Sequence, residues 1–484
     1  MTKIESLDLY VRETKPARFA SALGKKGQQG GKVERVTSPL CHLKLKLSGA
    51  DGERVFGCSA DRLSVRWLDK RPGRSKGLKL RELVRLIETA RSIHLKNSEF
   101  ETPFEQWRKC HETIMAQGRK QGQELLTCTY VSALFERAII DGFCRLHKKP
   151  FFQMLGERRL GLDLSSIHPE LERLERGPVL RNLPKWQVFV RHTIGLLDPL
   201  TLDDLAAEQR PNDGLPETIE DYIRREGVRY FKVKISGDVD ADLKRLAKIW
   251  ELVSTAPQPS LTLDANEAYD DLDLFASFVR RLEKEQLGLF QHILFIEQPL
   301  SRKIALQESA AKQIRKIGEI KPLVIDESDG FVGAYRRAHE LGYAGVSHKN
   351  CKGVFKSLLN HGLTMHYSLS GEPAMMSGED LQNLPIVPLQ QDLVTVGVLG
   401  LDHCERNGHH YNYGLSMLSD KDKESATRNH PDLYVKRGDE WFLRIRNGQL
   451  SFSSLHKKGF GGMDEPDWES MTPLRNWVDQ RYPA

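Results

Sequence analysis

Long apolar runs and a strong charge of either sign are both missing from this sequence. No stretch of 18 or more apolar residues occurs among the 484 residues, which excludes an ordinary transmembrane helix. Lys and Arg number 72 against 66 Asp and Glu, for a formal net charge of +6. So small a bias, without a basic motif interleaved with aromatic residues, does not indicate nucleic-acid binding. We expect neither membrane nor nucleic acid as a partner, and the mild positive charge suits a small anionic molecule.

Paired cysteines and a secretion signal are also missing. The seven cysteines form no C-x-x-C pair, and the first residues, MTKIESLDLYVRETK, contain no apolar segment. Together these absences indicate reduced thiols and a cytoplasmic location. A cysteine nucleophile or a zinc set remains open as an alternative, and Cys404 with His409 and His410 invites the zinc interpretation. That spacing matches no structural zinc pattern, so a polar loop is the simpler interpretation.

The first 155 residues combine strand and helix patterns. Alternating residues over 4–12 and 41–48, and a GADG turn at 49–52, predict antiparallel strands. Residues 77–155 then turn helical, apart from a polar segment at 94–122 that fits neither pattern well. The Gly- and Lys-rich segment 15–31 is either a surface loop or a mobile lid over a site.

Strand–helix alternation begins near residue 185. Short apolar runs alternate with amphipathic helices up to about residue 400, which predicts βαβ units around a parallel sheet. At least seven strands fit, LTMHYSLSG (363–371) among them, and an eighth could lie near VGVLGLDH (396–403). This number of units predicts an α/β fold with a (β/α)₈ barrel.

The pattern breaks again after about residue 415, where an Asn447-Gly448 turn predicts a hairpin. We therefore predict three parts: an α+β capping domain at 1–155, a barrel at 156–415, and a segment at 416–484 that packs on the capping domain.

Charged residues end five of the predicted barrel strands. They are Lys234, Asp264, Glu297, Asp326 and Lys349. Their spacing of one strand plus one helix puts them on consecutive strands at the carboxyl end of the barrel, where barrel enzymes have their sites. Any one of them alone would be a helix cap or a solvated residue. All five at matching positions predict a common site.

Three converging carboxylates repel one another unless a cation neutralises them. An all-oxygen set suits Mg²⁺, with positions left for water and substrate. Such a metal can bind a substrate carboxylate and stabilise the charge that forms when the neighbouring carbon loses a proton. The flanking lysines would carry protons, and we expect the metal and their mutual repulsion to lower their pKa values.

These segments resemble the enolase superfamily, and more closely its muconate-lactonizing and mandelate-racemase-like branches. The resemblance rests on FKVKISGD (231–238), LTLDANEAY (261–269), FIEQPL (295–300), VIDES (324–328) and SHKNCKG (347–353), with the helical segment 132–156. It implies a modified (β/α)₇β barrel with a capping domain built from both chain ends, and one Mg²⁺ per site. It also implies a homo-oligomer.

The same resemblance implies roles for single residues. Asp264, Glu297 and Asp326 would be the metal ligands, and Lys234 and Lys349 the acid and base. Lys232 would polarise the substrate carboxylate. The lysine at strand six favours the muconate-lactonizing type, because the mandelate-racemase type pairs an Asp there with a His on the next strand. His366 lies on the strand we predict next, without such an Asp, so a structural histidine is favoured.

Substrate contacts are assigned on weaker grounds. Asn266 follows the first ligand, Glu372 is expected at the rim of strand seven, and Asp402, with His403 and Glu405, is expected near the end of strand eight. The chain is longer than usual for that branch, and KGV replaces the family's glycine pair after Lys352, so the substrate stays undetermined.

The sequence therefore predicts an Mg²⁺-dependent enzyme that removes the alpha proton of a small anionic carboxylate through a metal-stabilised enediolate. Racemisation, epimerisation, cycloisomerisation and loss of water all remain open. The alternatives are an acid-sugar dehydratase of the mandelate racemase type, which uses one lysine with another acid, and a non-catalytic binding protein on the same fold.

Overall fold

The N-terminal region folds into an antiparallel sheet packed against helices. A computed structural model describes residues 1–15, 18, 39–175, 183–380 and 384–482. In it, β1 (Thr2–Arg12) pairs with β2 (Leu40–Ser48), which pairs with β3 (Arg54–Arg62). Alternation buries one face, as Leu43, Leu45 and Leu47 show. The predicted turn at 49–52 joins β2 to β3. Segment 15–31, predicted as either a surface loop or a mobile lid, lies outside the described residues, except for residues 15 and 18.

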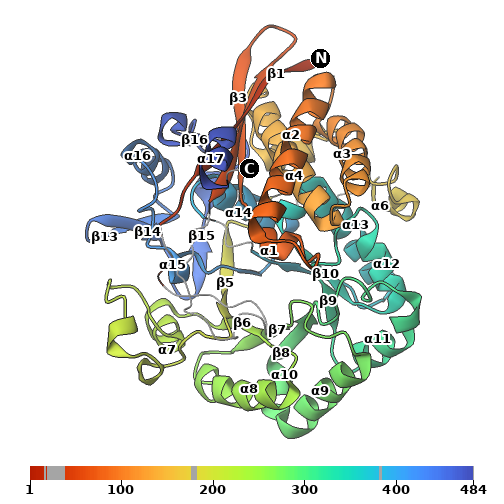
Figure 1. The fold of residues 1–484 in the computed structure, drawn as a ribbon, viewed down its shortest axis with the longest axis vertical. Coiled ribbons are helices and arrows are strands. Elements are labelled where there is room, and N and C mark those ends of the chain that lie inside the picture. Colours follow the sequence, from red (N-terminus) through yellow and green to blue (C-terminus); the bar gives the residue numbers. More distant parts are fainter. Residues whose placement is uncertain (16–17, 19–38, 176–182, 381–383, 483–484) are drawn as a thin grey trace.

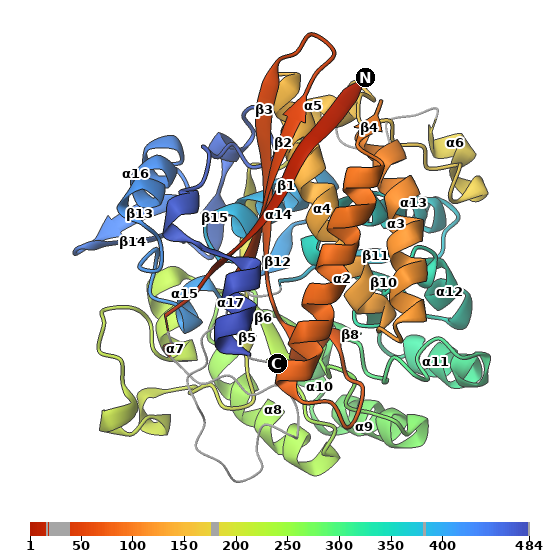
Figure 2. The same cartoon turned by 45° about the horizontal axis from the view of Figure 1, so that its top comes forward.

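Helices cover this sheet, as Figures 1 and 2 show. The helices α2 (Lys76–Lys96) and α4 (Leu125–Leu146) contact its strands, and α1 (Val65–Leu68), α3 (Pro103–Lys120) and α5 (Phe151–Gly156) pack on these two helices. The polar segment 94–122 forms the end of α2, the short β4 (Glu99–Phe100) and α3. The side chain of Thr102 caps α3 by accepting a hydrogen bond from the Glu105 amide, with Pro103 in the first turn.

Eight parallel strands close into the predicted barrel. They are β5 (Gln187–Ile194), β6 (Tyr230–Lys234), β7 (Ser260–Asp264), β8 (Ile293–Glu297), β9 (Leu323–Ile325), β10 (Gly345–His348), β11 (Met375–Gly378) and β12 (His403–Glu405). Closure occurs where β12 pairs with β5 in parallel, with Cys404 opposite Val190. The closed barrel under an antiparallel capping sheet confirms the predicted fold class.

Helices surround the barrel in the order of the chain (Figure 1). They include α8 (Val239–Val253), α9 (Leu272–Glu285), α10 (Leu287–His292), α11 (Ala311–Gly318) and α12 (Ala334–Leu341). Between β5 and β6 lie the short α7 (Ile219–Asp221) and a π-helical turn, Tyr222–Glu226.

The position predicted for strand seven is wrong, and strand eight begins only at His403, the last residue of the segment near which it was predicted. LTMHYSLSG belongs to α13 (Val354–Leu369), because its apolar residues continue a helical period that begins at Val354. His366 is therefore on a helix rather than on a strand. Most of VGVLGLDH belongs to α14 (Val387–Leu399), which ends at Gly400 with φ 72°. The true strands have only four and three residues, too short for an alternating pattern to be visible.

These shifts move two predicted rim residues to the opposite end of the barrel. Glu372 precedes β11 and Asp402 precedes β12, so both lie at the amino ends of their strands. Their side chains are 52% and 80% exposed. Neither Glu372 nor Asp402 lies at the carboxyl end of the barrel, where the sequence analysis expects them.

The C-terminal segment contacts both the cap and the barrel. It begins with α16 (Asp420–Asn429) and the hairpin of β13 (Tyr434–Arg437) and β14 (Glu440–Leu443). The Asn447-Gly448 turn carries one antiparallel bridge, and the following β15 (Gln449–Ser451) pairs with barrel strand β5. The longer hairpin, formed by β13 and β14, has its turn at Gly438 and not at the predicted Asn447-Gly448. Last, β16 (Thr472–Pro473) pairs with β1, and α17 (Leu474–Arg481) follows. The boundaries at 155 and 415 remain our proposal.

Within the described ranges, none of the helices combines the length and the apolar character that crossing a bilayer requires. All seven cysteines are in the described part of the chain, buried and without a disulfide.

Candidate active site

Buried lysines and carboxylates meet at the carboxyl end of the barrel. Lys232 and Lys234, two residues apart on β6, share the face that points into the barrel. Asp264 ends β7, Glu297 ends β8, and Asp326 follows β9. Each of these three carboxylates is at most 1% exposed.

Each predicted proton carrier contacts one of these carboxylates. Lys234 Nζ lies 2.6 Å from Asp264 Oδ2. Lys349 follows β10, is buried, and pairs with Asp326 Oδ2. Because β6 and β10 are four strands apart in an eight-stranded barrel, the two ammonium groups approach the acidic cluster from opposite sides.

Side chains beside the acids hold the strand ends in place. Gln298, in the left-handed region with φ 36°, accepts hydrogen bonds at Oε1 from the Asp326 amide (2.8 Å) and the Ser328 amide (3.0 Å). Asn266, with φ 44°, accepts from Lys234 Nζ at 2.7 Å and donates to Glu327 Oε1 at 3.1 Å. Asn266 therefore lies in the cluster, as the sequence predicts.

Lys352 is part of the cluster although we had assigned it no role. Its Nζ lies 3.1 Å from Asp326 Oδ1, 3.2 Å from Asp329 Oδ2 and 2.7 Å from Ser347 Oγ. Asp326 is thus contacted by two lysines on different oxygens. The motif SHKNCKG contains both lysines, three residues apart. This spacing is the feature of the sequence that could have indicated a role for Lys352.

The last two strands and the first supply a second group, of which the sequence indicates only Glu405. Glu379 follows β11 and Glu405 ends β12, and both are buried. Arg191 of β5 forms an ion pair with Glu379 Oε1, which also accepts from Ser377 Oγ at 2.5 Å. Thr193 Oγ1 donates to Glu405 Oε1 at 2.5 Å. The misplaced strand seven hid Glu379.

The capping domain covers one side of the site. The ring centroid of Trp67, in α1, is 4.7 Å from Lys349 Nζ. Lys70 Nζ lies 2.5 Å from Glu267 Oε2, and Arg302 donates to the Trp67 carbonyl at 3.1 Å. These contacts join the cap to the loops after β7 and β8.

Burial and charge shift the pKa values in opposite directions across the cluster. Burial, followed by repulsion from Asp264 and Glu379, raises the pKa of Glu297 well above its usual value. Burial opposes ionisation of Asp326, but the nearby lysines outweigh it and place its pKa well below the ordinary range. Burial likewise lowers the pKa of Lys349, but Asp326 outweighs it and the pKa is raised. The sequence predicts a lowered pKa for Lys349. In this structure Asp326 pairs with Lys349, so the pKa is raised instead.

The chemistry of the acids suits a divalent cation. Five carboxylate oxygens lie within 3.1 Å of Lys232 Nζ, whereas an ammonium has three protons. Glu297 Oε2 is accordingly buried without a hydrogen bond. The oxygens thus have capacity for a further cation, and buried carboxylates are hard-cation ligands. In the present arrangement no three Asp, Glu, His or Cys side chains of the described residues are grouped to hold an ion, because lysines contact each predicted ligand.

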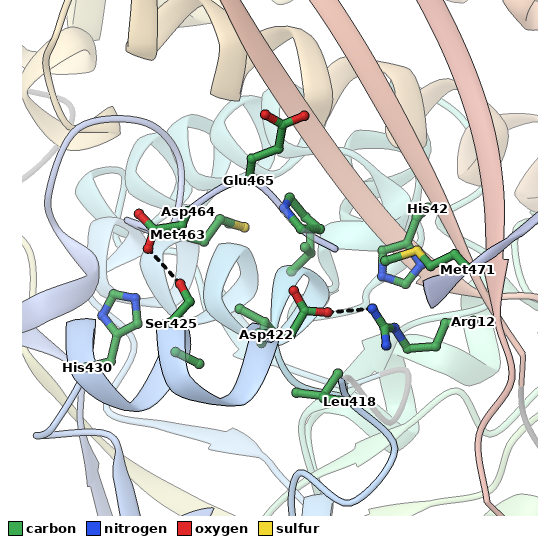
Figure 3. A pocket seen from close by; sticks show the side chains of 14 residues that line it. Arg12, His42, Leu418, Asp422, Ser425, His430, Met463, Asp464, Glu465 and Met471 are labelled. Carbon is green, nitrogen blue, oxygen red and sulfur yellow. Dashed lines mark hydrogen bonds and ion pairs between the residues drawn. The ribbon is translucent and has the colours of Figure 1, made fainter. Parts of the chain in front are cut away.

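Other candidate locations offer less chemistry. Glu372 lies 3.8 Å from His339, and Asp402 pairs with Lys185, so neither reaches the cluster. Burial raises the pKa of Cys404 to about 12, which opposes a thiolate role. Figure 3 shows a separate pocket of about 20 Å³ between the cap and the C-terminal segment, large enough for a single water molecule. Its Arg12 and Asp422 pair with each other at 2.5 Å.

Comparison with known proteins identifies the barrel. Residues 214–353 match the family model described as enolase C-terminal domain-like. No curated protein sequence matches the chain.

Solved structures resemble the whole chain. An enolase from Bradyrhizobium, complexed with magnesium and mandelic acid, is 15% identical with a TM-score of 0.58 and covers 97% of both chains. A mandelate racemase/muconate lactonizing protein from Herpetosiphon aurantiacus is 16% identical with a TM-score of 0.56, over 96% of this chain and 99% of that one. A dipeptide epimerase from Enterococcus faecalis V583, complexed with Mg and the dipeptide L-Leu-L-Tyr, is 14% identical with a TM-score of 0.55, over 95% and 99%. The predicted resemblance is thus confirmed: residues 214–353 match the enolase C-terminal domain-like family model, and the whole chain has the fold of these solved structures, the mandelate racemase/muconate lactonizing protein among them.

Proposed function

We propose that this protein is an Mg²⁺-dependent enzyme that removes the proton alpha to the carboxylate of a small anionic substrate. One observation carries the proposal. The ammonium groups of Lys234 and Lys349 contact the same buried acidic cluster from opposite sides of the barrel. A substrate carbon between them would have a proton carrier on either face, which is what racemisation or epimerisation requires.

Asp264, Glu297 and Asp326 would hold the cation. They are the acids at the ends of three consecutive strands, and oxygen ligands of this kind suit Mg²⁺. When bound there, the cation would offset the negative charge that develops on the substrate carboxylate.

The two lysines would exchange roles as acid and base. Lys349 is protonated while it pairs with Asp326, because that carboxylate raises its pKa. It can accept a proton only after losing one, and it loses one more readily when Asp326 is engaged elsewhere. Trp67, over the ammonium of Lys349, would exclude water from that side of the substrate.

Similar solved structures support the substrate class. Mandelic acid in the Bradyrhizobium enolase and L-Leu-L-Tyr in the Enterococcus epimerase are both small carboxylates. Lys232 and Asn266 remain our candidates for contacts with the substrate carboxylate. The structure encloses Lys232 among protein carboxylates at 1% exposure, so its part in binding is less direct than we predict for Asn266.

Solvent hydrogen exchange tests this function without knowledge of the product. The protein with Mg²⁺ is incubated in D₂O with a panel of small carboxylates, and deuterium at the alpha carbon is measured. We expect at least one member to be labelled, and labelling to stop with a chelator or with Lys234→Ala. Lys244→Ala, an exposed lysine on α8, is the matched control and should label normally. Absence of labelling across the panel, or labelling that survives the chelator, contradicts the proposal.

A further inference from the structure

The ammonium of Lys232 lies in a cage of four carboxylates. Its Nζ is 2.9 Å from Asp264 Oδ2, 3.0 and 2.8 Å from the two oxygens of Glu297, 2.5 Å from Glu379 Oε2 and 3.1 Å from Glu405 Oε2. Three protons cannot serve five acceptors. Lys232 therefore has a choice of partners, and a competing cation can take some of them without leaving it unpaired.

The four carboxylates fall into two pairs. Asp264 and Glu297 are the acids that we assign to the cation. Glu379 and Glu405 lie on the other side of the barrel mouth, at β11 and β12.

Glu379 and Glu405 are fixed from behind. Oε1 of Glu379 is held by Arg191 and Ser377, and Oε1 of Glu405 by Thr193. The Oε2 atom of each acid faces Lys232. Each glutamate is therefore anchored by one oxygen and presents the other to the ammonium.

A divalent cation and the ammonium cannot share Asp264 and Glu297. The ammonium now lies 2.9 Å from Asp264 Oδ2 and 2.8 Å from Glu297 Oε2, and two cations at such a distance in a buried site repel strongly. The ammonium has to withdraw when the cation binds, and a buried lysine needs carboxylate partners at its new position.

We propose that Glu379 and Glu405 are positioning residues that receive the ammonium of Lys232 when a divalent cation takes over Asp264 and Glu297. This inference rests on the proposed cation site and adds a function for the second group of acids. It also explains why Arg191 is buried directly behind them, since it holds Glu379 in place.

A double-mutant cycle tests the proposal through Mg²⁺ affinity, measured by calorimetry on the full chain without substrate. Glu379→Gln should weaken Mg²⁺ binding by about tenfold, the lower end for outer-shell residues. In the Lys232→Met background the same substitution should change affinity by less than about twofold, because the group it serves is gone. An equal loss in both backgrounds means that Glu379 acts on the cation directly, and no loss in the wild-type background means that it has no part; either overturns the proposal.

Two further measurements keep the test decisive. Glu372→Gln, at the opposite end of the barrel, removes the same charge and should leave Mg²⁺ affinity unchanged. If the cluster variants do not fold, a crystal structure of the wild-type protein with Mg²⁺ decides. The ammonium of Lys232 should contact Glu379 and Glu405 and no longer Asp264; retention of the Asp264 contact, or extension toward solvent, overturns the inference. Failure of the wild-type protein to bind Mg²⁺ rejects the proposed function itself, whereas Mg²⁺ binding with an additive cycle rejects only this inference.

Discussion

The mouth of the barrel has two sides that use charge differently. On the side formed by β6 to β10, lysines pair with the acids that we assign to a cation, and two of these lysines would move protons. On the side formed by β11, β12 and β5, Glu379 and Glu405 are tied to Arg191, Ser377 and Thr193. The first side has groups whose partners can change during a reaction, and the second has groups whose partners are fixed. A site that must release and recapture cations needs groups that can change partners and groups that stay in place.

The largest expected effect separates the two lysines of the first side. Lys349→Ala should slow alpha-hydrogen exchange by about 10²- to 10⁴-fold, the usual contribution of a positioned acid or base. Deuterium incorporation and product stereochemistry are measured together. Loss of turnover with both Lys349→Ala and Lys234→Ala identifies a two-base isomerase. Exchange that survives Lys349→Ala identifies the dehydratase alternative, in which one lysine works with another acid.

Arg191→Met tests whether the second side is structural. It removes one of the two cations that contact buried Glu379, the other being Lys232, so it should lower the free energy of unfolding by about 3 kcal/mol. Urea unfolding measures the change. Arg281→Met is the control, because Arg281 pairs with Asp240 and Glu285 on the exposed surface, where ion pairs contribute little. Equal losses for the two variants would remove the distinction between the sides.

The pH dependence of stability sharpens the same contrast. His403, on β12, accepts a hydrogen bond from Arg191 at 2.6 Å, and burial, aided by Arg191, lowers its pKa to about 3 from an ordinary 6.5. Above pH 6.5 neither the folded nor the unfolded state binds this proton. Below it the unfolded state does and the folded state does not, so stability is lost as the pH falls toward 3.

His403→Asn should therefore flatten the decline in the free energy of unfolding between pH 6 and 4, by about 1.4 kcal/mol per pH unit. The measurement is a series of urea denaturations across that range. An unchanged slope would mean that His403 is protonated in the folded protein and that Arg191 is not its donor.

The smallest effect is expected at the amino ends of the strands. Glu372→Gln and Asp402→Asn should each change Mg²⁺ affinity and hydrogen exchange by less than about twofold, because both side chains are exposed and far along the barrel from the cluster. A large effect at either residue would restore the specificity role that we first predicted.

The first side could be predicted from the sequence because its strands carry their own pattern. YFKVK, LTLD and ILFIE are apolar runs that end on a charge, and their spacing equals one strand plus one helix. The barrel and the positions of Lys234, Asp264 and Glu297 follow from that regularity.

The second side could not be predicted because its strands are short and their neighbours mislead. MMSG and HCE hold too few residues for alternation, while the preceding helices contain apolar runs that resemble buried strands. The sequence therefore gives no sign of Glu379 and favours Glu372 in its place, and it indicates Glu405 only together with Asp402 and His403. Contacts across the barrel, such as Lys232 with Glu405, depend on closure and have no local signature.

The most direct test of the account is the position of a divalent cation in the protein. Mn²⁺, which shares the oxygen preference of Mg²⁺ and scatters anomalously, can be located in crystals of the wild-type protein. The account predicts one anomalous peak, coordinated by oxygens of Asp264, Glu297 and Asp326 together. A peak coordinated by Glu379 and Glu405 instead, or no peak at the barrel mouth, would contradict it.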